Sequence, residues 1–93
     1  MDDIKKGQIV FSKAGRDKDH FFVVIDYIKP YAYLVDGATR RFENPKKKKD
    51  KHIQVTSYID EILRDLLEKE SQISNADIRK SLSRFIQEAD QKQ

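Results

Sequence analysis

The sequence contains no cysteine and no tryptophan, and it has only three glycines and two prolines. Without cysteine, disulfide bonds, thiolate metal sites and a cysteine nucleophile are excluded. No apolar run approaches the roughly 20 residues that a membrane-spanning helix needs. Residues 1–6 also lack the apolar centre of a signal peptide. We therefore expect a cytoplasmic protein with no membrane partner.

Positive charge is concentrated in the first part of the chain. Residues 1–55 hold 13 Lys and Arg against 8 Asp and Glu, whereas residues 56–93 hold 6 against 8. A polyanionic partner would therefore bind the first part. The length of 93 residues fits one small domain, or one domain with an appendage.

The first part of the chain has the pattern of a small β protein. Short runs rich in β-branched and aromatic residues predict strands over residues 8–12, 20–28, 31–35, 39–43 and 53–55. Asp36-Gly37 is a hairpin signal before the fourth of these segments, which ends at Asn44-Pro45. Five short strands with tight turns predict a small barrel over residues 1–56.

The second part, residues 57–93, has helical periodicity and forms a predicted C-terminal extension. The first helical stripe consists of Ile59, Ile62, Leu63, Leu66 and Leu67. Ser74 and Asp77 have the spacing of a capping box at the start of a second helix. The stripe of that helix consists of Ile78, Leu82, Phe85, Ile86 and Ala89. The sequence leaves open whether the helices pack on the barrel or bind another protein.

A basic connection joins the first two predicted strands. Residues 13–20 contain the cationic or titratable side chains Lys13, Arg16, Lys18 and His20. Several donors on one loop can contact a nucleic-acid backbone, and each phosphate contact adds electrostatic affinity. The alternative is a solvated hairpin loop that is basic by chance.

The residues around this loop resemble a KOW motif. Residues 6–10, 12–18 and 23–25 carry the resemblance, and Asp19 stands where the KOW pattern has glycine. The resemblance extends to Asp36-Gly37 and to residues 44–49 and 74–80. It is closest to the small bacterial KOW domain-containing RNA-binding proteins. These are similar in turn to KOW-bearing ribosomal proteins. The resemblance implies an SH3-like barrel that binds RNA or the ribosome.

A second basic segment begins within the predicted fourth strand and continues beyond it. It comprises Arg40, Arg41, Lys46, Lys47, Lys48, Lys49 and Lys51. Lysine ammonium groups contact phosphates without reading bases, because they lack the planar fork of guanidinium. This segment and the loop of residues 13–20 could lie on one surface of a barrel. The alternatives are a solvated loop and, in a nucleated cell, an import signal.

Aromatic residues are numerous for so short a chain. Phe21, Phe22 and Phe42 are expected in the core, because a small barrel needs large side chains there. Tyr31 and Tyr33 lie next to a predicted turn. They could equally be core residues or exposed platforms on which RNA bases stack.

The sequence does not indicate an enzyme. The two histidines lack metal-ligand spacing, and three scattered glycines form no phosphate-binding loop. Asp60, Glu61 and Asp65 are expected to face solvent, opposite the leucine stripe. We therefore predict no catalytic site, no metal, no cofactor and no small-molecule substrate.

The function predicted from the sequence is binding of structured or ribosomal RNA through basic loops. The first alternative is an SH3-like module that docks a transcription or ribosome component, with the loops only solubilising. The second is binding of duplex DNA. Strong salt dependence distinguishes RNA binding from protein docking, and a preference for RNA loops distinguishes it from duplex DNA binding.

Overall fold

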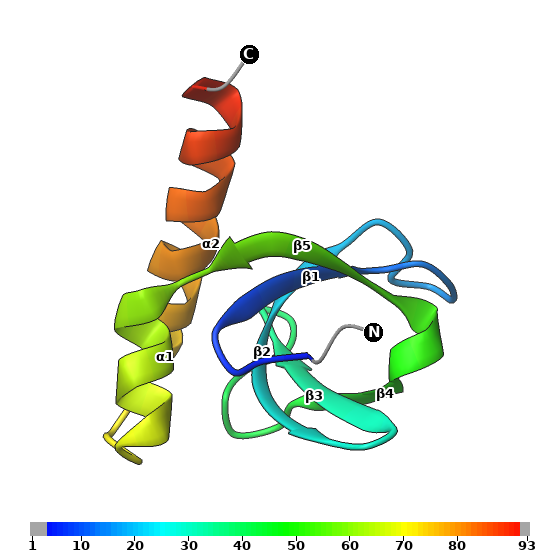
Figure 1. The fold of residues 1–93 in the computed structure, drawn as a ribbon, viewed down its shortest axis with the longest axis horizontal. Coiled ribbons are helices and arrows are strands. Elements are labelled where there is room, and N and C mark those ends of the chain that lie inside the picture. The colour runs from blue at the N-terminus through cyan, green and yellow to red at the C-terminus, as the bar shows by residue number, and fades with distance from the viewer. Residues whose placement is uncertain (1–3, 92–93) are drawn as a thin grey trace.

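The fold is a curved β-sheet followed by two helices (Figure 1). The computed structural model describes residues 4–91, with side chains for residues 4–89, so the outermost residues of the two predicted regions lie outside it. The strands are β1 (Gln8–Ser12), β2 (Phe21–Ile28), β3 (Tyr31–Val35), β4 (Lys46–Lys49) and β5 (Ile53–Ile59). A 3-10 helix, η1 (Asp50–His52), joins β4 to β5. The α-helices are α1 (Glu61–Glu68) and α2 (Asn75–Gln91).

The strands form one antiparallel sheet in the order β4-β3-β2-β1-β5. The sheet bends strongly, and β4 and β5 lie at its two edges (Figure 1). Within residues 4–91 no strand pairing joins these two edges, so the sheet is open. The prediction of a mainly β chain with C-terminal helices is therefore confirmed, as are the first three strands.

The predicted fourth strand, residues 39–43, is wrong. This segment belongs to a loop of residues 36–45, and the lysine run itself forms β4. The Asp36 carboxylate holds the loop, accepting hydrogen bonds from Ala38 N (2.9 Å), Thr39 Oγ1 (2.6 Å) and Arg40 N (2.8 Å). The chain bends after Asp36, where Gly37 has a φ of +79°, but the hydrogen bonds to the Asp36 side chain stop it from entering a strand there.

The sheet has a buried cluster on each face. Alternate residues of a strand point to opposite faces. The inner cluster consists of Ile4, Val10, Phe22, Val24, Ala32, Leu34 and Ile53. The outer cluster combines Ile9, Val23 and Val35 of the sheet with Leu63, Leu67, Ile73 and Ile78 of the helical part. The helices therefore pack on the outer face of the sheet.

Asp60 connects the two helices, contrary to the prediction that it faces solvent. Its side chain is only 3% exposed, and it caps α1 by accepting a hydrogen bond from Leu63 N at 3.1 Å. It also accepts from Ser81 Oγ at 2.7 Å and from Arg84 Nη2 at 2.6 Å, both on α2. Burial raises the pKa of this carboxyl, but the hydrogen bonds and the guanidinium outweigh it and lower the pKa.

The start of α2 holds the loop of residues 36–45. Asn75 Oδ1 accepts a hydrogen bond from Phe42 N at 2.7 Å, and Arg79 Nη1 donates to Gly37 O at 2.6 Å. Gly37 has a φ of +79°, and a Cβ there would lie 2.5 Å from Asn75 O. Only glycine fits both the backbone angle and this close approach. The predicted capping box is confirmed, because Ser74 Oγ accepts from Asp77 N and Asp77 accepts from Ser74 N.

Candidate nucleic-acid interface

The β1–β2 loop, residues 13–20, is held by its own backbone and by Ser12. Asp19 N donates to Ser12 O at 2.8 Å, and His20 N donates to Asp17 O at 2.9 Å. Asp19 has a φ of +70°, which is the left-handed region where glycine and, less often, Asp or Asn are found. Asp19 thus adopts the backbone conformation that the glycine of the KOW pattern would allow.

Asp17 joins this loop to β4. Its carboxylate lies 3.1 Å from Lys46 Nζ and 3.3 Å from Lys48 Nζ, and Ser12 Oγ donates to it at 2.7 Å. Burial raises the pKa of Asp17, but the hydrogen bond from Ser12 and the two ammonium groups outweigh it and lower the pKa to about 2. The two basic segments found in the sequence therefore lie side by side, linked by a carboxylate that stays ionised.

The four lysines of β4 are divided between two faces of the sheet. Lys46 and Lys48 pair with Leu34 and Ala32, whose side chains belong to the inner cluster. Directly paired residues share a face, so these two lysines lie on the Asp17 side and are only 28% and 12% exposed. Lys47 and Lys49 are exposed on the outer face.

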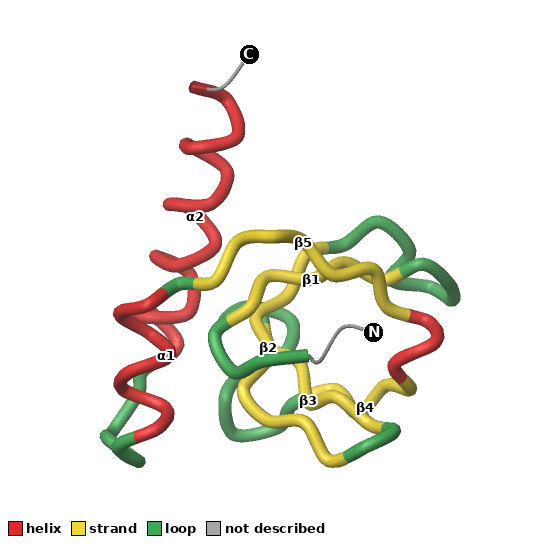
Figure 2. The backbone as a smooth tube through the Cα atoms, viewed as in Figure 1, coloured by secondary structure: helices red, strands yellow, loops and turns green. Residues whose placement is uncertain are grey.

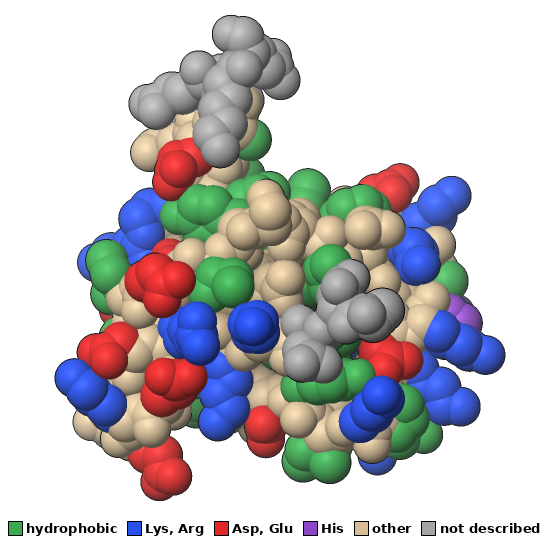
Figure 3. Space-filling view, viewed as in Figure 1, with side chains coloured by type: hydrophobic (Ala, Val, Ile, Leu, Met, Phe, Trp, Pro, Cys, Tyr) green, Lys and Arg blue, Asp and Glu red, His purple; other side chains and the backbone are tan. Residues whose placement is uncertain are grey.

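Exposed cations surround the junction of the loop with β4. Lys13 N donates to His52 O at 2.8 Å, so the loop also touches η1. Figure 2 shows this loop and η1 at the same end of the sheet, on the right. Lys and Arg side chains gather at this end of the molecule (Figure 3). Within residues 13–20 and 46–51, the exposed cations that form no ion pair are Lys13, Arg16, Lys18, Lys47, Lys49 and Lys51.

The remaining predicted site residues lie elsewhere or have other partners. His20 Nε2 lies 2.7 Å from Asp36 Oδ2, and its ring packs against Phe22 at 4.8 Å between centroids. Burial raises the pKa of Asp36, but hydrogen bonds from Thr39, the backbone and His20 lower it to about 2. Arg40 and Arg41 belong to the loop of residues 36–45, and Arg41 Nε lies 3.8 Å from Glu43. No hydrogen bond or ion pair among the described residues joins the side chains of these three residues to Asp17 or to β4.

Asp17, Asp36 and Asp60 hold other parts of the chain in place, a role that the sequence did not predict for them. Each organises the cations or loops around it, and each has a lowered pKa. For Asp17, the signal in the sequence was a carboxylate inside a basic loop. For Asp60, it was an aspartate immediately before an apolar helical stripe, where an N-cap is expected.

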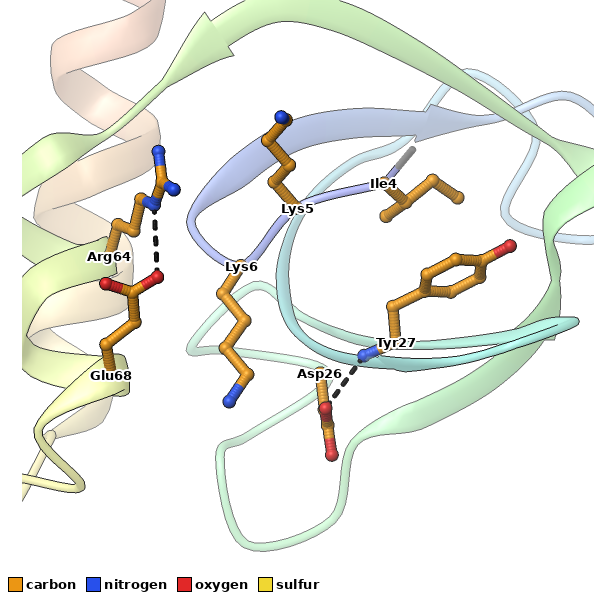
Figure 4. A pocket seen from close by; sticks show the side chains of 7 residues that line it. All are labelled: Ile4, Lys5, Lys6, Asp26, Tyr27, Arg64 and Glu68. Atoms are coloured by element: carbon orange, nitrogen blue, oxygen red, sulfur yellow. Dashed lines mark hydrogen bonds and ion pairs between the residues drawn. The ribbon is translucent and has the colours of Figure 1, made fainter. Parts of the chain in front are cut away.

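A polar pocket of about 370 Å³ lies between the N-terminal segment, β2 and α1 (Figure 4). Its lining includes Lys5, Lys6 and Arg64, together with the carboxylates of Asp26 and Glu68. Arg64 Nε donates to Glu68 at 3.3 Å, so opposite charges already meet within the pocket. In the part of the chain that the structure describes, no cluster of His, Asp and Glu could hold a metal ion.

Comparison with models of known protein families and with curated protein sequences gives no match for this chain. Among residues 4–91, no helix is both long and apolar enough to cross a membrane. The functional conclusion therefore depends on the geometry of the basic surface and on the motif residues.

Proposed function

We propose that this chain binds RNA through the phosphates, using a basic surface formed by the β1–β2 loop, β4 and η1. The observation that carries the proposal is the position of Asp17 between the loop and β4, which brings two basic segments together. Residues 13–20 and 46–51 hold eight Lys and Arg against three Asp. A surface with such an excess of cations attracts a polyanion and releases its counterions on binding.

The cations on this surface have two different roles. Lys46 and Lys48 hold Asp17, and through it the loop, whereas the six exposed cations are free to contact phosphates. If all six do so on single-stranded or looped RNA, log K should fall with log salt at a slope of about −4 (about −0.7 per contact). Ammonium groups do not read bases, so this surface supplies affinity with little sequence discrimination.

The KOW resemblance extends the proposal to the cellular role and to the finer architecture. The five short antiparallel strands and the strong curvature of the sheet support the proposal that this fold is of the SH3-like barrel type. The motif supports structured or ribosomal RNA as the ligand, with the ribosome as the partner and the cytoplasm as the compartment. Asp19 stands where the motif has glycine, and its φ of +70° is a backbone angle that glycine adopts readily, which is compatible with this resemblance.

Salt-dependent binding of a labelled RNA stem-loop tests the proposal. Wild type should bind at low salt with the slope given above, and more tightly than to a DNA duplex of equal charge. The double variant Lys18→Gln/Lys51→Gln removes two exposed cations and should reduce the magnitude of the slope by about 1.4. The double variant Lys69→Gln/Lys80→Gln on the helical part removes the same charge and should leave it unchanged. Equal slopes for the two variants would overturn the proposal.

Protein docking is a second candidate function, favoured by a different surface. A groove of about 260 Å³ lies between β5 and α2 and is lined in part by Tyr58 and Phe85. Ile86 follows on α2 and is 52% exposed, and exposed apolar side chains next to a groove are typical of protein contacts. If wild type binds no RNA at low salt while Ile86→Asp abolishes capture of a partner protein, this second function replaces the first.

A further inference from the structure

The outer face of the sheet continues beyond the area covered by the helices. The helical part packs over Val23 and Val35, which pair directly across β2 and β3. Further along the same two strands, Asp26 pairs with Tyr33 and Ile28 pairs with Tyr31. Directly paired residues share a face, and Tyr33 lies two positions from Val35. Both tyrosines therefore lie on the outer face.

The direction of the side chains supports this assignment. Tyr27 packs against the inner cluster, and Figure 4 shows Asp26 pointing away from the Tyr27 ring on the opposite side of β2. Both tyrosines of β3 are half-buried, and Ile28 beside them is 60% exposed. Aromatic rings thus form part of the molecular surface here and do not belong to either buried cluster.

Two lysines of β4 border these rings. Lys49 pairs with Tyr31, and Lys47 pairs with Tyr33. Lys47 Nζ also lies 4.4 Å from the centroid of the Tyr31 ring, so a flexible cation rests on an aromatic face. Lys47 and Lys49 thus lie on the same face of the sheet as the two tyrosines. The lysines that hold Asp17 lie on the opposite face.

We propose that Tyr31 and Tyr33 form a stacking platform for unpaired RNA bases, with Lys47 and Lys49 binding the phosphates between them. This inference rests on the proposed RNA-binding function and names the kind of RNA that is bound. Successive outward residues of a β-strand lie about 7 Å apart. The bases of an extended, unstacked RNA strand can follow this spacing. A base arriving at Tyr31 displaces the ammonium group of Lys47, which then pairs with the adjacent phosphate.

The stacking platform supplies selectivity for unpaired bases, which the basic surface lacks. Phosphate contacts are equally available on single strands and duplexes, whereas stacking on a protein ring requires a base that is free of its own neighbours. Asp26 lies at the far end of the platform, opposite Tyr33, and its negative charge disfavours a phosphate at that position. The predicted ligand is therefore a short unpaired stretch, such as a loop or bulge, that lies across β3 and the edge strand β4.

The test compares two single strands that differ only in their bases. Labelled oligoadenylate and an abasic strand of the same length are titrated with wild type at equal salt, and binding is followed by fluorescence anisotropy. Wild type should bind oligoadenylate roughly fivefold or more tightly, which corresponds to one stacked base. Tyr31→Leu/Tyr33→Leu should lose this ratio, because leucine keeps an apolar side chain without a stacking ring. The control Tyr31→Phe/Tyr33→Phe keeps the rings and should keep the ratio.

The outcomes separate this inference from the proposed function. Equal affinity of wild type for the two strands overturns the stacking platform and leaves phosphate binding in place. A ratio that persists in the leucine variant also overturns it, because the bases then stack elsewhere. If wild type binds neither strand at about 50 mM salt, the proposed RNA-binding function itself fails.

Discussion

The ion pairs of Asp17 predict a specific loss of stability in Asp17→Asn. The pKa of this carboxyl falls from 3.8 to about 2, and each pKa unit corresponds to about 1.4 kcal/mol. The charge of Asp17 therefore contributes about 2 kcal/mol to the free energy of unfolding near neutral pH. Asparagine can still accept from Ser12, but it leaves Lys48, which is only 12% exposed, without its anion. We expect urea denaturation near neutral pH to show a decrease of this size.

The difference in stability between wild type and Asp17→Asn should become smaller at low pH. Because the folded pKa of Asp17 is lowered, its stabilising effect is complete above pH 3.8 and is lost as the pH falls toward 2. The difference between wild type and Asp17→Asn should therefore narrow over that interval. The matched control is Asp19→Asn in the same loop, where the side chain is exposed and asparagine tolerates the positive φ. Equal effects of the two substitutions, or a difference that is independent of pH, would refute the reasoning.

Four further substitutions test other parts of the structure by urea denaturation and RNA titration. Asp60→Ala removes the cap of α1 and the buried partner of α2, and should lower the free energy of unfolding by about 2–4 kcal/mol. Gly37→Ala should lower it by about 1–3 kcal/mol, because the new Cβ meets the backbone of α2 at a positive φ. Lys48→Gln should lower it by about 1 kcal/mol, whereas Lys49→Gln should change stability by less than about 0.5 kcal/mol and weaken RNA binding instead. Similar stability for the two lysine variants would contradict the division of β4 between two faces.

The strands with strong apolar patterns could be predicted from the sequence, and the fourth strand could not. Residues 8–12 and 31–35 coincide with β1 and β3 because β-branched and aromatic residues dominate them. Four consecutive lysines have no such pattern. They form β4 because alternate side chains meet Asp17 on one face and tyrosines on the other, and these partners are distant in the sequence.

The candidate site was predictable in composition but not in its internal connections. Counting charges was enough to find the two basic segments and to expect them on one surface. The sequence could not show that Asp17 reaches β4, because that contact spans about 30 residues and depends on the sheet's curvature. Nor could it separate His20 from the other loop residues, since its partner Asp36 lies at the end of β3.

The outer cluster has a practical consequence for any minimal fragment of this chain. A fragment ending at residue 56 would retain every strand pair except the end of β5, yet it would uncover Ile9, Val23 and Val35. It would also release the loop of residues 36–45 from Asn75 and Arg79. Such a fragment would expose an apolar face to other copies of itself and tend to aggregate. The helices therefore form a second layer that covers the outer face of the sheet. A fragment designed for binding studies has to include the chain beyond Ile78.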